Sequence, residues 1–264
     1  GMILFKEFML TPWISVFIGM VLSYLLATLI GYGTLRLRGA YFAIGTIAFA
    51  ETLRVLILYF KKITGGSLGI YVRPKETGFL SLAFKNDIPF YYIMLVLLCL
   101  TLFISYRFTK SKSGYYLSAI KGDEDAAISL GMETFKIKLR AFQLSAVICS
   151  VIGTFYGFFM TYIEPMSIAG LDMSVKIATV AIVGGLGTLW GPVIGAFILI
   201  PLIELAGSLL GHFGGGHILY GLVLVIAVIF KPNGLITVFK RDADTRLPGK
   251  PLISFGRKKR EAEK

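Results

Sequence analysis

The sequence contains little that could bind a metal ion or form disulfide bonds. It has only two cysteines and two histidines in 264 residues. Cys99 and Cys149 each lie in a separate apolar segment, with no partner at metal-ligand spacing and no extracellular disulfide framework around them. His212 and His217 flank a glycine turn, but no third ligand type accompanies them. We therefore expect no metal site and interpret both cysteines as packing residues.

Charged residues are also scarce, which indicates a membrane protein. They make up 16% of the chain, against about 25% in an ordinary soluble domain. Hydrophobic residues make up 56%, and the mean hydropathy is +0.77. A helix needs roughly 20 mostly apolar residues to cross the bilayer core, and six segments fit this description: 13–35, 40–60, 90–106, 141–163, 176–210 and 218–230. The expected fold is all-α, a polytopic membrane helix bundle with about six to eight membrane segments.

One glycine-rich stretch, AIVGGLGTLWGPVIGA at 181–196, interrupts the longest apolar segment. As a single helix, 176–210 would be about 50 Å long, well beyond the bilayer core. A phosphate-binding loop is excluded, because the stretch has no Walker lysine, no preceding strand and no acidic ribose contact downstream. Glycine weakens a helix, whereas proline suits the first turn of a new one. We predict that the helix is broken or re-entrant at five residues: Gly184, Gly185, Gly187, Gly191 and Pro192.

Glycines also recur at four-residue spacing in this half of the chain, as in the pair Gly153 and Gly157 and the pair Gly191 and Gly195. Small residues at this spacing allow membrane helices to approach closely. We interpret these pairs as packing positions, which say nothing of transport.

Basic residues predict which segments face the cytoplasm. From Lys231 onward the chain has ten basic and four acidic residues, which supplies +6 of the formal net charge of +12. Lys and Arg concentrate on the cytoplasmic side, so we expect a transmembrane domain at 1–231 and a basic cytoplasmic tail at 232–264. RKKR at 257–260 could bind nucleic acid, but contact with lipid is the simpler interpretation. If 176–210 crosses the membrane twice, 19 basic residues lie on the cytoplasmic side and seven on the outer side. If it crosses once, the counts are 17 and nine, so basic residues favour two crossings only slightly.

One polar loop, GYYLSAIKGDEDAAISLGM at 114–132, has the features of a short helix that contacts a partner. Asp123 suits a helix N-cap, Glu124 and Asp125 favour the positive helix start, and Gly131 can supply a left-handed stop. The small and apolar residues between these ends would fit a groove on another protein. A surface linker helix with ordinary caps fits equally well, so both interpretations stay open.

Five motifs in series resemble one known family. They are LRLRGAYFAIGTIAFAETLR (35–54), TGGSLGI (64–70), AIKGDEDAAISLGM (119–132), VGGLGTLWGPVIGA (183–196) and GLVLVIAVIFKPNGL (221–235). In this order they resemble the permease subunit of the branched-chain amino-acid ABC importer family, over nearly the whole chain. Members of that family usually have two or so further membrane segments upstream of the region like 13–35. We therefore expect that the N-terminal part of the family pattern is missing here.

The resemblance implies a function and a set of partners. It implies a multi-pass permease in a prokaryotic cell membrane that imports branched-chain amino acids or a related small polar solute by alternating access. The implied partners are a second permease, two cytoplasmic ABC ATPases and an extracytoplasmic substrate-binding protein. This chain would bind no cofactor and catalyse no reaction, since ATP and Mg²⁺ belong to the ATPases. The residues that would couple it to an ATPase are Gly114, Ala119, Asp123, Glu124, Asp125, Ala126, Ala127 and Gly131.

Few residues are candidates for lining the solute path. Glu51 and Arg54 share a helix face, and charged residues at membrane depth are often functional. Thr46 lies on roughly the same side, and Glu204 lies within the broken segment. Interhelical polar contacts would explain all four as well, and such contacts are frequent in membrane bundles. The glycines of TGGSLGI, in a loop expected outside, fit a simple turn or a docking point for the binding protein.

Two other classes of protein are compatible with parts of the sequence. An ion-coupled secondary transporter also uses broken helices at mid-membrane, but it usually carries an internal repeat, which we do not detect. A membrane-embedded enzyme needs clustered His, Asp or Glu on helix faces, which two histidines in a glycine turn do not supply.

Overall fold

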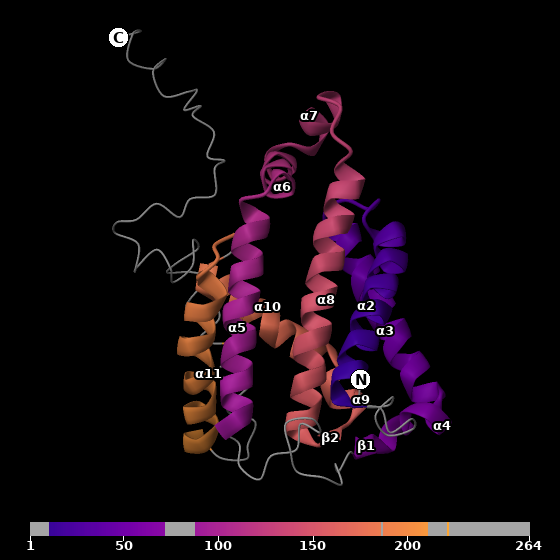
Figure 1. Ribbon diagram of the computed structural model, residues 1–264, viewed down its shortest axis with the longest axis vertical. Helices are drawn as coiled ribbons and strands as arrows, with labels where there is room; N and C mark the ends of the chain where they lie inside the picture. Colours follow the sequence, from indigo (N-terminus) through magenta and orange to yellow (C-terminus); the bar gives the residue numbers. More distant parts are fainter. Residues whose placement is uncertain (1–10, 72–87, 186, 211–220, 222–264) are drawn as a thin grey trace. The chain divides into compact units, whose positions relative to one another are not determined.

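The computed structural model describes residues 11–71, 88–185, 187–210 and 221, and these residues are predominantly helical (Figure 1). The long helices are α2 (Pro12–Thr34), α3 (Ala40–Tyr59), α5 (Ile88–Thr109), α8 (Thr134–Met160), α10 (Leu171–Gly185) and α11 (Gly191–Leu210). Short elements connect them: α4 (Lys61–Thr64), η1 (Gly66–Leu68), β1 (Ile70–Tyr71), α6 (Lys112–Gly122), α7 (Glu124–Ser129), β2 (Tyr162–Ile163) and α9 (Pro165–Ile168).

Five of the described helical segments are long and apolar enough to cross a membrane: Pro12–Thr34, Ala40–Tyr59, Ile88–Thr109, Thr134–Met160 and Pro165–Gly185. The prediction of an all-α, polytopic membrane fold is therefore confirmed. The observed helices extend the predicted segments 90–106 and 141–163 by several residues toward the polar loop between them. The predicted segment 218–230, the tail 232–264, and the histidines at 212 and 217 lie outside the residues that can be described, apart from residue 221.

The chain divides into two compact units, Gly1–Arg107 with Glu133–Val180 and Phe108–Met132 with Ala181–Lys264. In the first unit, α2 packs along α8. At one end of this pair lies a cluster of buried apolar side chains from α2, β1, α5 and α8: Val16, Ile70, Phe90, Phe155 and Phe158. The edge of the Trp13 ring packs against Phe155, with ring centroids 5.8 Å apart.

The contact between α2 and α8 depends on small residues. A Cβ on Gly19 would lie 3.3 Å from the Ser150 hydroxyl oxygen, and one on Gly31 would lie 2.7 Å from Cδ1 of Leu139. Glycine at these positions therefore lets the helices approach closely, as is usual in membranes. Polar side chains support the packing, because Gln143 Nε2 donates a 2.8 Å hydrogen bond to Thr28 Oγ1. The sequence analysis did not single out this pair of helices.

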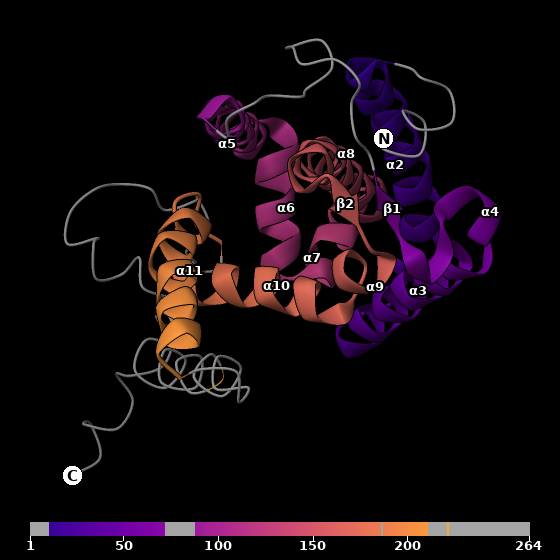
Figure 2. The same ribbon diagram turned by 90° about the horizontal axis from the view of Figure 1, so that it is seen from below.

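A two-residue antiparallel ladder joins two segments that are far apart in sequence (Figure 2). Ile70 of β1 lies opposite Ile163 of β2, and Tyr71 lies opposite Tyr162. The Tyr162 hydroxyl also donates a 3.1 Å hydrogen bond to the carbonyl oxygen of Leu68. The ladder therefore places the segment after α3 and the segment after α8 at the same end of the first unit. This agrees with a topology in which both segments leave the membrane on one side.

Candidate functional site

The polar loop begins with a tight turn from α5 into α6. The Ser111 hydroxyl donates a 2.6 Å hydrogen bond to the Phe108 carbonyl and accepts a 3.4 Å hydrogen bond from the backbone N–H of Gly114, which is an N-cap arrangement. A side chain on Gly114 would overlap the carbonyl oxygen of Thr109. Glycine is therefore required at position 114 for the chain to turn this sharply.

The short helix predicted after Asp123 is present as α7. Oδ1 of Asp123 accepts hydrogen bonds from the backbone N–H groups of Asp125 (2.9 Å) and Ala126 (3.0 Å). The helix ends before Gly131, whose φ of +80° is left-handed, as the sequence predicts. Local capping signals thus determine both ends of α7.

One face of α7 packs inward while its far end projects apolar side chains. Ala127 is 3% exposed, and α7 contacts α6, where Ile120 is buried. Ile128 and Leu130 are 45% and 78% exposed. Because α7 combines exposed apolar groups with a capped backbone, it has the shape expected of a docking helix. Contact with an ATPase stays a prediction.

The long apolar segment is interrupted between Gly185, which ends α10, and Gly191, which begins α11. Gly185 and Gly187 have φ values of +128° and +77°, which side chains rarely adopt. A Cβ on Gly184 would overlap the carbonyl oxygen of Gly191, so the two helix ends touch through their backbones. Pro192 is the second residue of α11, where its missing N–H costs no helical hydrogen bond.

Thr188 holds this turn together. Its hydroxyl donates a 2.8 Å hydrogen bond to the carbonyl oxygen of Gly185 and accepts a 3.1 Å hydrogen bond from the backbone N–H of Gly191. One side chain thus connects the last residue of α10 to the first residue of α11. The sequence analysis did not identify Thr188, although a threonine between two glycines in an apolar segment is a signal that could have found it.

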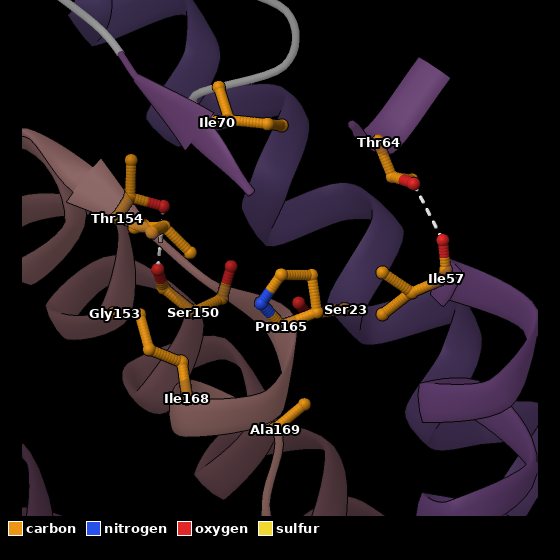
Figure 3. A pocket seen from close by; sticks show the side chains of 11 residues that line it. Ser23, Ile57, Thr64, Ile70, Ser150, Gly153, Thr154, Pro165, Ile168 and Ala169 are labelled. Atoms are coloured by element: carbon orange, nitrogen blue, oxygen red, sulfur yellow. Dashed lines mark hydrogen bonds between the residues drawn. The ribbon is translucent and has the colours of Figure 1, made fainter. Parts of the chain in front are cut away.

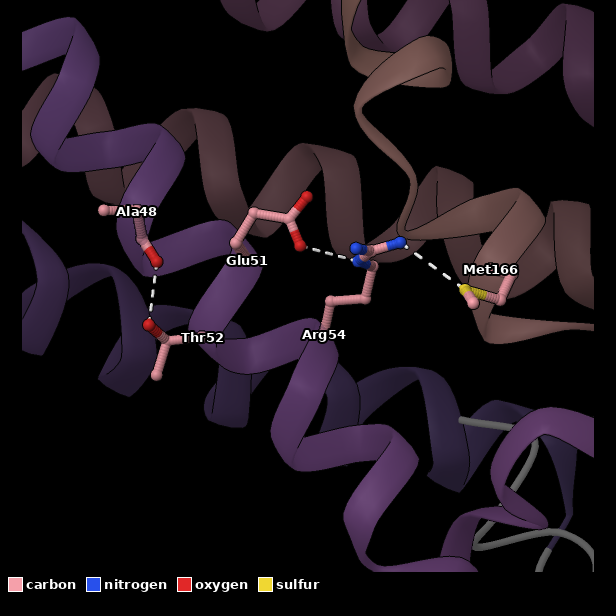
Figure 4. A network of polar contacts seen from close by, with 5 residues as sticks. All are labelled: Ala48, Glu51, Thr52, Arg54 and Met166. Carbon is pink, nitrogen blue, oxygen red and sulfur yellow. Dashed lines mark hydrogen bonds and ion pairs between the residues drawn. The ribbon is translucent and has the colours of Figure 1, made fainter.

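The four predicted path residues have different surroundings. Nε of Arg54 lies 2.7 Å from Oε2 of Glu51, and Nη1 of Arg54 lies 3.4 Å from the sulfur of Met166 in α9 (Figure 4). The Thr46 hydroxyl donates to carbonyl oxygens of its own helix, 2.9 and 3.0 Å away. Glu204 is exposed on α11, in the other unit. The structure therefore brings Glu51 and Arg54 together, and their role in a path stays a prediction.

A pocket of about 520 Å³ lies in the first unit, in the region of the ladder (Figure 3). Helices α2, α3, α4, α8 and α9 and both strands contribute side chains to it. Four lining residues carry hydroxyl groups: Ser23, Thr64, Ser150 and Thr154. The other lining residues are apolar or glycine, and isoleucines from α3, β1, β2 and α9 are prominent among them.

The lining of this pocket suits a small and mainly aliphatic ligand, because none of the lining residues is charged. The Thr154 hydroxyl donates to the Ser150 carbonyl at 2.8 Å, so its own oxygen can still accept a hydrogen bond. A Cβ on Gly153 would meet nothing within 4 Å, which shows that this glycine opens onto free space. No described residue packs against Gly153, so the expectation that it serves close helix packing stays a prediction.

The sequence analysis predicted no pocket: it interpreted Gly153 as a packing residue and placed Thr64 and Ile70 only within the TGGSLGI motif. The usable signals were Ser15, Gly19 and Ser23 at four-residue spacing on α2, and Ser150 and Thr154 at the same spacing on α8. These patterns identify the two facing helices. They do not show where the pocket lies, which also depends on β1, β2 and α9.

Comparison with known proteins identifies the family. The model of the family described as "Branched-chain amino acid transport system / permease component" matches residues 1–230. This chain belongs to that family. The match includes every helix described above and agrees with the resemblance seen in the five sequence motifs.

Several permease proteins are similar to the chain. The high-affinity branched-chain amino acid transport system permease protein LivM of Salmonella typhimurium is 30% identical over 231 residues, which cover 79% of this chain and 53% of LivM. LivH of Escherichia coli is 28% identical over 142 residues, 54% of this chain and 44% of LivH. The autoinducer 2 import system permease protein LsrC of Yersinia enterocolitica is 25% identical over 226 residues, 80% of this chain and 60% of LsrC.

The chain spans about half the length of LivM from Salmonella typhimurium and from Escherichia coli. No solved structure matches it.

Proposed function

We propose that this chain is the membrane-spanning permease subunit of an ATP-driven importer for branched-chain amino acids or a related small solute. The observation that carries the proposal is the family match over residues 1–230, on a chain whose polar loop forms a capped helix with exposed apolar side chains. ATP hydrolysis takes place on partner ATPases, and an extracytoplasmic binding protein delivers the solute. The similarity to both LivM and LivH supports pairing with a second, related permease.

The proposed mechanism is alternating access driven through α7. Ile128 and Leu130 insert into a groove on an ATPase, and the acidic start of α7 contacts basic groups beside that groove. Movement of α7 then passes to the membrane helices α5 and α8, because only short turns separate them from the polar loop. Rigid-body rocking of packed helices is a common way to convert such movement into a change of access.

The pocket is the proposed contact site for the solute within this chain. Its volume lies in the range typical of small-molecule sites, about 300–1,000 Å³. Its isoleucines suit a branched aliphatic side chain, and the hydroxyl of Thr154 can accept a hydrogen bond. Arg54, which pairs with Glu51, lies about one helical turn from Ile57, a lining residue, and can face the charged end of a zwitterion.

A substitution at the exposed end of α7 tests the coupling. Leu130→Asp should abolish co-purification with the ATPase and reduce uptake at least tenfold, while the permease stays in the membrane. Leu68→Asp is the matched control for ATPase binding, because Leu68 is 84% exposed, against 78% for Leu130, and lies outside the polar loop. Unchanged uptake and unchanged ATPase binding by Leu130→Asp would contradict the proposal. Charge reversal at Glu124 and Asp125, which leaves the Asp123 cap intact, should also uncouple uptake.

A second substitution tests the pocket. Gly153→Leu places an aliphatic side chain in open space, so it should weaken solute transport by competing for the pocket without disturbing α8. The control is Cys149→Leu, at an exposed position on the same helix. If Gly153→Leu transports the solute with an unchanged apparent affinity, the pocket is not the contact site.

A further inference from the structure

Lys121 reaches the turn between α10 and α11. It lies in the last turn of α6, and its ammonium nitrogen is 3.2 Å from the position that a Cβ would occupy on Gly187. Both residues belong to the second compact unit. A side chain of the polar loop therefore approaches the helix break closely, although more than 60 residues separate the two in sequence.

The chemistry of this contact is favourable. The last carbonyl groups of a helix have no partner within the helix and carry a partial negative charge. Lys121 places a positive charge two residues beyond Gly185, where α10 ends. An ammonium group has three donors and no acceptor, so it matches a helix end that presents only acceptors. Gly187 leaves room for this group, because a side chain there would crowd the lysine nitrogen.

Lys121 is also close in sequence to the proposed docking helix. Only Gly122 separates it from Asp123, whose side chain caps the first turn of α7. A force that displaces α7 must therefore displace Lys121, and the ammonium group would move against the turn. Within that turn, the Thr188 hydroxyl connects the end of α10 to the start of α11.

We propose that Lys121 is a positioning residue that couples α7 to the α10–α11 turn, so that ATPase movement changes the angle of the broken membrane helix. This rests on the proposed function. A charge at a helix end favours one of two states by about two- to fivefold when it is exposed. Lys121 is exposed, so its removal should reduce solute transported per ATP by this factor and leave folding intact.

A spin label beside the turn tests the proposal in the complete transporter. The label is attached to Trp190→Cys, an exposed position within the turn, after Cys99→Ser and Cys149→Ser. With the native lysine, adding ATP and vanadate should change the mobility of the label. Lys121→Gln should reduce this change and the transport per ATP, whereas Lys121→Arg should retain both. Lys112→Gln, at the other end of α6, is the matched control and should behave as the parent does.

The outcomes separate this proposal from the proposed function. If Lys121→Gln responds to ATP as the parent does and transports equally well, the coupling role of Lys121 is refuted while the importer function stands. If the parent with native Lys121 shows no response to ATP, the proposed ATP-driven function fails and the inference fails with it. An equal loss in Lys112→Gln would show that any lysine of α6 has this effect, which also overturns the proposal.

Discussion

The Thr188 hydroxyl provides a direct test of how the helix break is stabilised. Thr188→Val keeps the branched shape of the side chain and removes both hydrogen bonds, the 2.8 Å bond to Gly185 and the 3.1 Å bond from Gly191. Each neutral hydrogen bond contributes about 0.5–1.5 kcal/mol in water-soluble proteins, and about 0.6 kcal/mol on average between membrane helices. The loss should therefore be about 1–3 kcal/mol. For a chain of this size, this corresponds to a fall in the apparent Tm of roughly 2–10 °C.

The assay is thermal unfolding of the purified protein in detergent. Thr188→Ser keeps the hydroxyl and should retain most of the stability. Thr52→Val is the matched control, because the Thr52 hydroxyl only donates a 2.8 Å hydrogen bond to the Ala48 carbonyl within its own helix (Figure 4). That carbonyl lies in the interior of α3, where a helical N–H also bonds to it, so we expect a change of less than about 0.5 kcal/mol. Equal effects of Thr188→Val and Thr52→Val would refute the role of Thr188.

Two further predictions concern the packing of the helices. Gly184→Ala should lower the apparent Tm by several degrees, because its Cβ meets the backbone oxygen of Gly191. Gly153→Ala should leave the apparent Tm unchanged or raise it, because its Cβ meets free space. Thermal unfolding of both variants checks this, and equal effects of the two would contradict the prediction. A double-mutant cycle of Gln143→Leu and Thr28→Val, measured as free energies of unfolding, should give a coupling energy of about 0.6–1.7 kcal/mol. Additive effects would show that the 2.8 Å hydrogen bond between Gln143 and Thr28 contributes nothing to stability.

The features that could be predicted from the sequence depend on neighbouring residues. Asp123 caps the helix that follows it because the hydrogen-bond donors are two and three residues away. The long apolar segments become helices because the bilayer requires every backbone group to be paired within the segment. The break at Gly184 to Gly191 follows from the excess length of one segment and from the weakness of a helix that contains several glycines.

The features that could not be predicted depend on residues far apart in the chain. Two-residue strands such as β1 and β2 carry too short a pattern to be recognised, and their pairing also determines where the pocket lies. Arg54 contacts Met166 of α9, a partner that no spacing rule indicates. The close approach of the Lys121 ammonium group to Gly187 is likewise not indicated by any spacing rule. The sequence could therefore identify the helices of the candidate site but not the contacts between them.

Glycine shows most clearly why spacing alone is insufficient. Gly31 and Gly153 both lie in membrane helices and both have small residues four positions away. A Cβ on Gly31 would meet the end of the Leu139 side chain, which can move, whereas one on Gly184 would meet a backbone oxygen, which cannot. A Cβ on Gly153 would meet open space. Glycine therefore serves close helix packing at Gly31, the close approach of two helix ends at Gly184 and an open pocket at Gly153. Only the atoms that face each glycine distinguish these roles.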